Sequence, residues 1–171
     1  NKSQHIELIN YCKSKKIEFL STAFDLESID LLKQLNIKIF KIPSGEITNG
    51  PFILEFAQKK RNIILSTGMS TIADIKKALS IIAFGFIHDI ESRVEPSEEA
   101  FLKAFNSPKG KNLLKERVTL LHCTTQYPAP INEVNLNAIS EMRNFFGLDI
   151  GYSDHTNGIL IPIAAVALGA S

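Results

Sequence analysis

Short apolar segments alternate with helix-forming segments along most of the chain, and this alternation limits the possible folds more than any other feature. The apolar segments are residues 16–22, 37–42, 62–66, 118–123 and 149–153. Capping residues mark the helices between them: Asp25 and Thr71 at helix starts and Gly147 at a helix end. Short apolar strands that alternate with helices are typical of βαβ units with parallel strands.

Each predicted strand ends in small polar residues. The strand ends are Ser21-Thr22, Ser44-Gly45-Glu46, Ser66-Thr67-Gly68, Thr124-Thr125 and Ser153-Asp154-His155. An open doubly wound sheet competes with a (β/α)8 barrel, but no strand is followed by the glycine-rich fingerprint of a dinucleotide-binding sheet. Sites built from many strand ends are typical of barrels. We therefore predict an α/β TIM barrel, which is incomplete because five units cannot close a barrel of about 250 residues.

The predicted barrel domain covers residues 1–171 and contains one irregular region. Between residues 84 and 117 the alternation gives way to a charged, mixed segment without a recognisable motif. We predict that residues 84–117 are an insertion between regular units. The chain begins with Asn1 and ends at Ser171, where a helix should lead into another strand. We therefore expect a piece of a longer chain.

Composition and charge argue against several classes of function. The formal net charge is +1, which gives no reason to expect binding to nucleic acid or to a membrane surface. No apolar run reaches the roughly 18–20 residues of a membrane-spanning helix. The two cysteines, Cys12 and Cys123, are far apart in the sequence. We expect them to be reduced thiols of a cytoplasmic protein.

Lysine and hydroxyl residues at the strand ends predict an anion site. Lys41 lies at the end of its strand, and Thr22, Ser44 and Ser66 could each donate a hydrogen bond to a phosphate oxygen. Taken singly, the lysine equally fits a side chain that reaches the barrel rim, and each hydroxyl fits a cap or a turn. Their recurrence at successive strand ends favours a site for a phosphorylated anion.

Three further residues are candidates for chemistry at this edge of the barrel. Glu46 could act as an acid or base, and Tyr127 could line a sugar pocket. The alternatives are a solvated carboxylate and a tyrosine that packs beside prolines. His155 is suited to a divalent metal, although a single histidine does not make a metal site. Cys123 faces away from its neighbour His122, so we expect a small buried apolar residue rather than a nucleophile.

Five motifs occur along the chain in a fixed order. They are Phe19-Leu20-Ser21-Thr22-Ala23-Phe24, Lys41-Ile42-Pro43-Ser44-Gly45-Glu46, Ile64-Leu65-Ser66-Thr67-Gly68-Met69, Leu121-His122-Cys123-Thr124-Thr125-Gln126-Tyr127-Pro128 and Gly151-Tyr152-Ser153-Asp154-His155-Thr156. Each motif alone is a weak signal. Together they resemble the sialic acid synthase family, which contains N-acetylneuraminate, legionaminate and pseudaminate synthases. The resemblance covers nearly the whole chain outside the insertion.

The resemblance implies a barrel enzyme, a transferase that condenses phosphoenolpyruvate with N-acetylmannosamine or a related acetamido sugar. The products would be a nine-carbon 2-keto acid and phosphate. Phosphoenolpyruvate contacts are implied at Thr22, Lys41, Ser44, Ser66, Thr125 and Ser153. Thr125 stands where some members have asparagine. Glu46 and Tyr127 match sugar-side positions, and His155 matches one of two histidines that bind a divalent metal, usually manganese.

The resemblance also implies parts that lie outside this sequence. The second metal-binding histidine and the first two barrel strands would fall beyond residues 1–171. The family's C-terminal antifreeze-like domain, which reaches into the partner's site in a homodimer, is absent. We therefore expect the chain alone to be catalytically inactive. The insertion is also longer than the family implies.

Two other functions stay open at this point. A different phosphoenolpyruvate-dependent synthase, making eight- or seven-carbon phosphorylated keto-sugars, would need basic residues for a sugar phosphate, and none is evident beyond Lys41. A degenerate, non-catalytic barrel segment could serve as a sugar-binding or assembly module. The absence of a downstream metal-binding histidine from the gene would favour that module.

Overall fold

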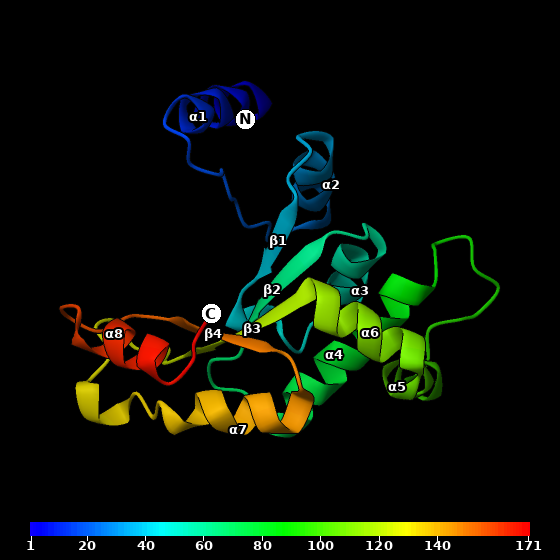
Figure 1. Cartoon of the computed structure of the whole chain (residues 1–171). Helices are drawn as coiled ribbons and strands as arrows, with labels where there is room; N and C mark the ends of the chain where they lie inside the picture. Colours follow the sequence, from blue (N-terminus) through cyan, green and yellow to red (C-terminus); the bar gives the residue numbers. More distant parts are fainter.

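A computed structural model describes residues 1–171 and contains one sheet of four parallel strands, connected by helices (Figure 1). The strand order is β1-β2-β3-β4, so each strand pairs with the next strand along the chain. This order has no switch point of the kind that defines a doubly wound sheet, and it is the order of a barrel segment. The predicted incomplete α/β barrel with parallel strands is confirmed.

The elements follow one another mostly as βα units. The strands are β1 (Ile39–Ile42), β2 (Asn62–Ser66), β3 (Val118–Cys123) and β4 (Asp149–Ser153). The α-helices are α1 (Lys2–Ser14), α2 (Leu26–Gln34), α3 (Gly50–Gln58), α4 (Ile72–Ile87), α5 (Glu98–Asn106), α6 (Pro108–Arg117), α7 (Asn137–Phe146) and α8 (Leu160–Ala167). Two short 3-10 helices are η1 (Ser44–Glu46) and η2 (Ile131–Glu133). None of the helices combines the length and the apolarity needed to cross a membrane.

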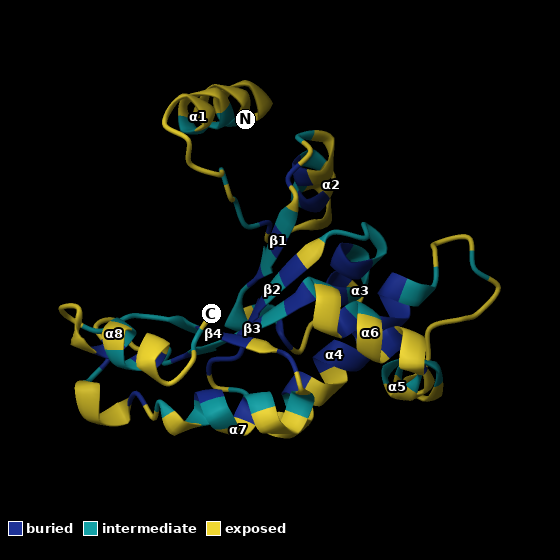
Figure 2. Ribbon diagram, in the orientation of Figure 1, coloured by how far each residue is buried: buried dark blue, intermediate teal, exposed yellow.

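Side chains alternate along each strand, so the strand register gives the sheet a largely apolar core face and an opposite face with polar groups at the carboxyl ends of the strands. One face carries residues that are at most 1% exposed: Phe40, Ile42, Ile63, Leu65, Leu120 and Ile150. These residues belong to one core cluster with the buried parts of α3 and α4, which are dark blue in Figure 2. The opposite face, here called the site face, carries at the carboxyl ends of the strands Lys41, Ser66, Cys123 and Ser153.

The segment 16–22, predicted to be the first strand, is not a strand. It pairs with no strand of the sheet, and Figure 1 shows it as part of an extended link after α1. A strand exists only through hydrogen bonds to a neighbour. Two of its three apolar residues also gain little burial, since Ile17 and Leu20 are 64% and 46% exposed, whereas Phe19 packs against the core. The sheet therefore has four strands where the sequence predicts five.

Helix ends follow the capping residues read from the sequence. The Asp25 side chain accepts from the Ser28 amide at the start of α2. Thr71 and Asp74 form a capping box at the start of α4. Gly147 ends α7 in the left-handed conformation, with φ at +66°. These predictions are confirmed, and they show that the helix limits are encoded locally.

The irregular region begins after Ile87 and not at residue 84 as predicted, because α4 continues to Ile87. Lys60 closes this helix end, where Nζ donates to three backbone carbonyl oxygens at 2.8–3.1 Å. The rest of the region forms α5 and α6, and Ser97 caps α5. The segment between the regular units is therefore helical and packs on the core through Ala104 and Leu114.

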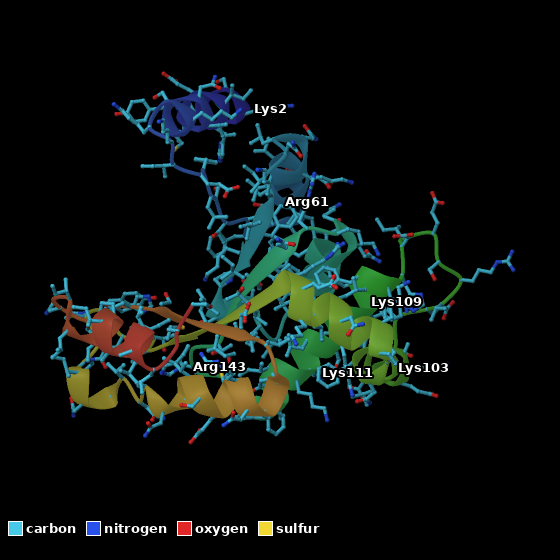
Figure 3. All side chains as sticks on the ribbon, in the orientation of Figure 1. Lys2, Arg61, Lys103, Lys109, Lys111 and Arg143 are labelled. Carbon is cyan, nitrogen blue, oxygen red and sulfur yellow. The ribbon has the colours of Figure 1, made fainter.

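Hydrogen bonds connect α7 to the residues that follow α8. Arg143 of α7 donates to the carbonyl oxygens of Leu168 and Gly169, just after α8 (Figure 3). The Ser171 amide then donates to the Ile150 carbonyl oxygen of β4 at 3.1 Å. The backbone thus returns from α8 to the edge of the sheet.

Gly85 allows α3 and α4 to pack closely, and replacing it should destabilise the fold. A Cβ atom at residue 85 would lie 2.5 Å from Ala57 Cβ and 3.3 Å from Leu54 Cδ1. Overpacking of this kind costs about 1–3 kcal/mol, so Gly85→Ala should lower the free energy of unfolding measured by urea denaturation. Gly45→Ala is the matched control, because a Cβ atom at residue 45 meets nothing within 4 Å. Equal stability of both variants and the wild type would contradict this account.

Candidate functional site

Lys41 and Ser66 bring a positive charge and a hydroxyl together at the carboxyl ends of β1 and β2. Lys41 Nζ donates to Ser66 Oγ at 2.6 Å. Ser66 is buried, with 3% of its surface exposed. Burial lowers the pKa of the Lys41 ammonium. Lys41 forms no salt bridge, so its charge is available to a bound anion.

Ser44 and Gly68 add a second hydrogen-bonded pair at this end of the sheet. The Gly68 amide donates to Ser44 Oγ at 2.9 Å. A Cβ atom at residue 68 would lie 2.5 Å from Thr125 Cγ2 and 3.0 Å from Ser44 Oγ, so this close approach requires glycine. We call Lys41, Ser44, Ser66 and Gly68 the anion cradle. An ammonium group beside hydroxyls, without a carboxylate partner, is suited to phosphate.

His155 lies in the loop after β4, and the loop after β3 orients its ring. Nδ1 lies 2.6 Å from the Thr124 carbonyl oxygen, and a carbonyl only accepts, so we assign the hydrogen to Nδ1. The neutral ring then has its lone pair on Nε2, which lies 3.4 Å from Ser153 Oγ. The Tyr127 ring lies beside the imidazole, with 4.3 Å between centroids. An imidazole oriented by a carbonyl oxygen is typical of metal-binding histidines.

His155 fits one position of a metal site, but the chain supplies no complete set of ligands. Residues 1–171 contain no group of three or more histidine, cysteine, aspartate or glutamate side chains placed to hold a metal ion. The neighbouring Asp154 carboxylate is engaged within its own turn. Its Oδ1 accepts from the Thr156 amide at 2.9 Å and from the Thr156 hydroxyl at 2.8 Å.

The other predicted residues take no part in these hydrogen bonds. Thr22 lies in the extended link, and its hydroxyl forms no hydrogen bond. Glu46 Oε2 accepts from Asn49 Nδ2 at 2.8 Å, next to the start of α3. Thr125 places its methyl group against Gly68. Of the predicted residues, the structure therefore pairs Lys41 with Ser66, bonds Ser44 to Gly68 at the same end of the sheet, and places Ser153 and Tyr127 beside His155.

Cys123 belongs to this site, although the sequence predicts only a small buried apolar residue. It is buried, with 7% exposed, but its Sγ also lies 3.4 Å from Ser44 Oγ. In the sheet, Cys123 pairs in register with Ser153. The two-residue period of β3 is the signal that could have revealed this role, since it places Cys123 on the same face as Ser66.

The NeuB family model matches residues 1–171, the whole chain. The chain is 49% identical to N,N'-diacetyllegionaminic acid synthase of Campylobacter jejuni over 166 residues, 97% of this chain and 42% of the relative. It is 39% identical to the protein of the same name from Legionella pneumophila, over 99% of this chain and 41% of the relative. The solved structure of N-acetylneuraminic acid synthetase from Leptospira borgpetersenii matches with a TM-score of 0.77 and 32% identity, over 99% of this chain and 50% of that one. The chain spans less than half the length of these curated relatives.

As the pH rises, anion binding in the cradle should begin to weaken at a lower pH than it would if the lysine were fully exposed to solvent. A lysine is charged below its pKa, and burial lowers the pKa of Lys41 from its ordinary 10.5. Phosphate monoesters lose their second proton near about pH 6, so the ligand itself does not titrate at alkaline pH. Isothermal titration calorimetry with a phosphate monoester should show a dissociation constant that rises with pH in the alkaline range. Lys41→Met should bind weakly throughout, and the same alkaline rise in that variant would contradict the assignment.

Proposed function

The chain belongs to the NeuB family, and on this premise we propose that it forms the phosphoenolpyruvate-binding part of a synthase of sialic-type acids. The proposed enzyme is a transferase that forms a C–C bond between phosphoenolpyruvate and N-acetylmannosamine or a related acetamido sugar. Its products are a nine-carbon 2-keto acid and inorganic phosphate. The observation that carries the proposal is the anion cradle, in which Lys41 bonds to Ser66 and the Gly68 amide bonds to Ser44.

The cradle is proposed to hold the phosphate group and to favour its departure. The Lys41 ammonium balances the negative charge, and the Ser44 and Ser66 hydroxyls donate to phosphate oxygens. The methylene carbon of phosphoenolpyruvate attacks the sugar aldehyde, whose oxygen gains a proton. Water adds to the phosphate-bearing carbon and loses a proton. The adduct then breaks its C–O bond to phosphate, and Lys41 stabilises the charge that gathers on the leaving group.

His155 is proposed to hold a divalent metal ion, in the first place Mn²⁺, through Nε2. When bound, the metal supplies Lewis-acid polarisation of the sugar aldehyde. The orientation of the ring supports this role, because the Thr124 carbonyl oxygen engages Nδ1 and leaves the Nε2 lone pair free of a backbone partner. A second protein ligand is proposed to come from outside residues 1–171.

The remaining candidates are assigned to the two substrates. Glu46 and Tyr127 are proposed to face the sugar, with Glu46 as an acid or base. Thr22, Thr125 and Ser153 are proposed phosphoenolpyruvate contacts. The Campylobacter and Legionella relatives are both named for N,N'-diacetyllegionaminic acid, which supports a diacetamido sugar as the first substrate to test.

We propose further that the complete protein is a cytoplasmic homodimer. Cys12 and Cys123 are free thiols, which supports a reducing compartment. Ile163 and Val166 on α8 are 60% and 67% exposed, which supports contact with additional protein surface. The net charge of +1 lends no support to nucleic-acid or membrane partners. Sedimentation equilibrium of the complete gene product measures the subunit number.

Release of inorganic phosphate tests the proposed reaction. The complete gene product, given phosphoenolpyruvate and Mn²⁺, should release phosphate only when a suitable acetamido sugar is added. A diacetamido sugar should give the highest rate in a panel. A requirement for a phosphorylated sugar that carries no acetamido group would favour the synthases of eight- or seven-carbon keto-sugars. No release with any sugar would exclude a synthase and favour the non-catalytic sugar-binding or assembly module.

Replacing His155 tests the metal assignment. His155→Ala in the complete gene product should reduce Mn²⁺-dependent turnover by at least roughly 100-fold, since mutating even the outer partners of metal ligands costs about 10- to 100-fold. Mn²⁺ binding, followed by electron paramagnetic resonance without substrates, should weaken as well. His5→Ala on α1 is the control and should leave both quantities unchanged. Unaltered Mn²⁺ binding by the His155→Ala protein would refute the assignment.

A further inference from the structure

The Cys123 thiol contacts the anion cradle directly. Its Sγ lies 3.4 Å from Ser44 Oγ, and a Cβ atom at residue 68 would lie 3.0 Å from the same sulfur. Register pairing places Cys123 beside Ser153 on the neighbouring strand. The residue is 7% exposed, so its surroundings are these protein groups rather than bulk solvent.

The hydrogen-bonding capacity of Ser44 gives this contact a consequence for anion binding. A serine hydroxyl donates one hydrogen and accepts through two lone pairs. The Gly68 amide occupies one lone pair, at 2.9 Å. If the Cys123 S–H group donates to the second, Ser44 has no lone pair left and its own hydrogen is free. If Ser44 donated to sulfur instead, an anion would have to displace that bond before it could bind.

We propose that Cys123 is a positioning residue of the anion cradle, whose S–H group donates to Ser44 Oγ and thereby directs the Ser44 hydroxyl hydrogen toward a bound phosphate group. This inference rests on the proposed function, which supplies the phosphate. The thiol forms no covalent bond. A thiolate would lack the hydrogen and would repel the anion, so the donor role needs the protonated form.

A set of binding measurements isolates this role. For both inorganic phosphate and phosphoenolpyruvate, Cys123→Ala should raise the dissociation constant about two- to fivefold, the size expected of one weak S–H···O bond. Cys123→Ser keeps a donor at this position and should restore the affinity. In a Ser44→Ala background, Cys123→Ala should cause no further loss, because Cys123 acts through Ser44. Isothermal titration calorimetry gives the constants, and thermal melts confirm that each variant is folded.

The possible outcomes separate this inference from the function on which it rests. If the wild type binds phosphoenolpyruvate and Cys123→Ala binds it equally well, the positioning role is wrong and the proposed function stands. If Cys123→Ala weakens binding by the same factor in the wild-type and Ser44→Ala backgrounds, the positioning role is also wrong. If the wild type binds neither ligand, the proposed function falls and the positioning role falls with it.

Alkylation of the wild-type protein tests the same role without any substitution. Saturating phosphate should slow the reaction of Cys123 with iodoacetamide, because the anion would lie against Ser44 next to the thiol. Cys12 on α1 is half-buried and outside the site, so its rate should not change. Peptide mass spectrometry follows both cysteines in one sample. Equal Cys123 rates with and without phosphate would overturn the positioning role.

Discussion

The common register of four parallel strands is the constraint on which the site depends. Side chains alternate along each strand, so the register that buries Phe40 and Leu65 also turns Lys41 and Ser66 to the opposite face. A slip of one residue would exchange the two faces and place an ammonium group in the apolar core. The packing of the core therefore holds the geometry of the site, although no core side chain belongs to it.

The fold is predictable from the sequence wherever its causes are local. The caps at Asp25 and Thr71 and the left-handed turn at Gly147 each depend on residues within one helical turn. Segment 16–22 differs because an apolar run indicates a tendency toward burial, whereas a strand also needs a hydrogen-bonding neighbour. Whether such a neighbouring strand is present depends on the whole sheet, and it cannot be read from a pattern of seven residues.

The sequence predicts the residue types of the candidate site better than its contacts. Polar strand ends point to Lys41, Ser44 and Ser66, since the carboxyl ends of parallel strands meet at one edge. Lys41 bonds to Ser66 and the Gly68 amide bonds to Ser44, across 25 and 24 positions of sequence, and only the folded chain reveals these pairs. Cys123 is missed because the sequence analysis treats burial and function as alternatives, whereas in the structure the buried thiol also contacts Ser44.

The connection between α4 and α5 is bounded by two helix ends that are closed independently of each other. Lys60 bonds to the carbonyl oxygens of Gly85 and Phe86 in α4 and of His88 just after it, and Ser97 caps the first turn of α5. Neither closure depends on how many residues lie between the two helices. Residues 90–96, beyond the Lys60 contacts with His88 and Asp89, are therefore a suitable place to splice in an affinity tag or a fluorescent reporter, and a chain labelled there would keep the strand register that its binding measurements rely on.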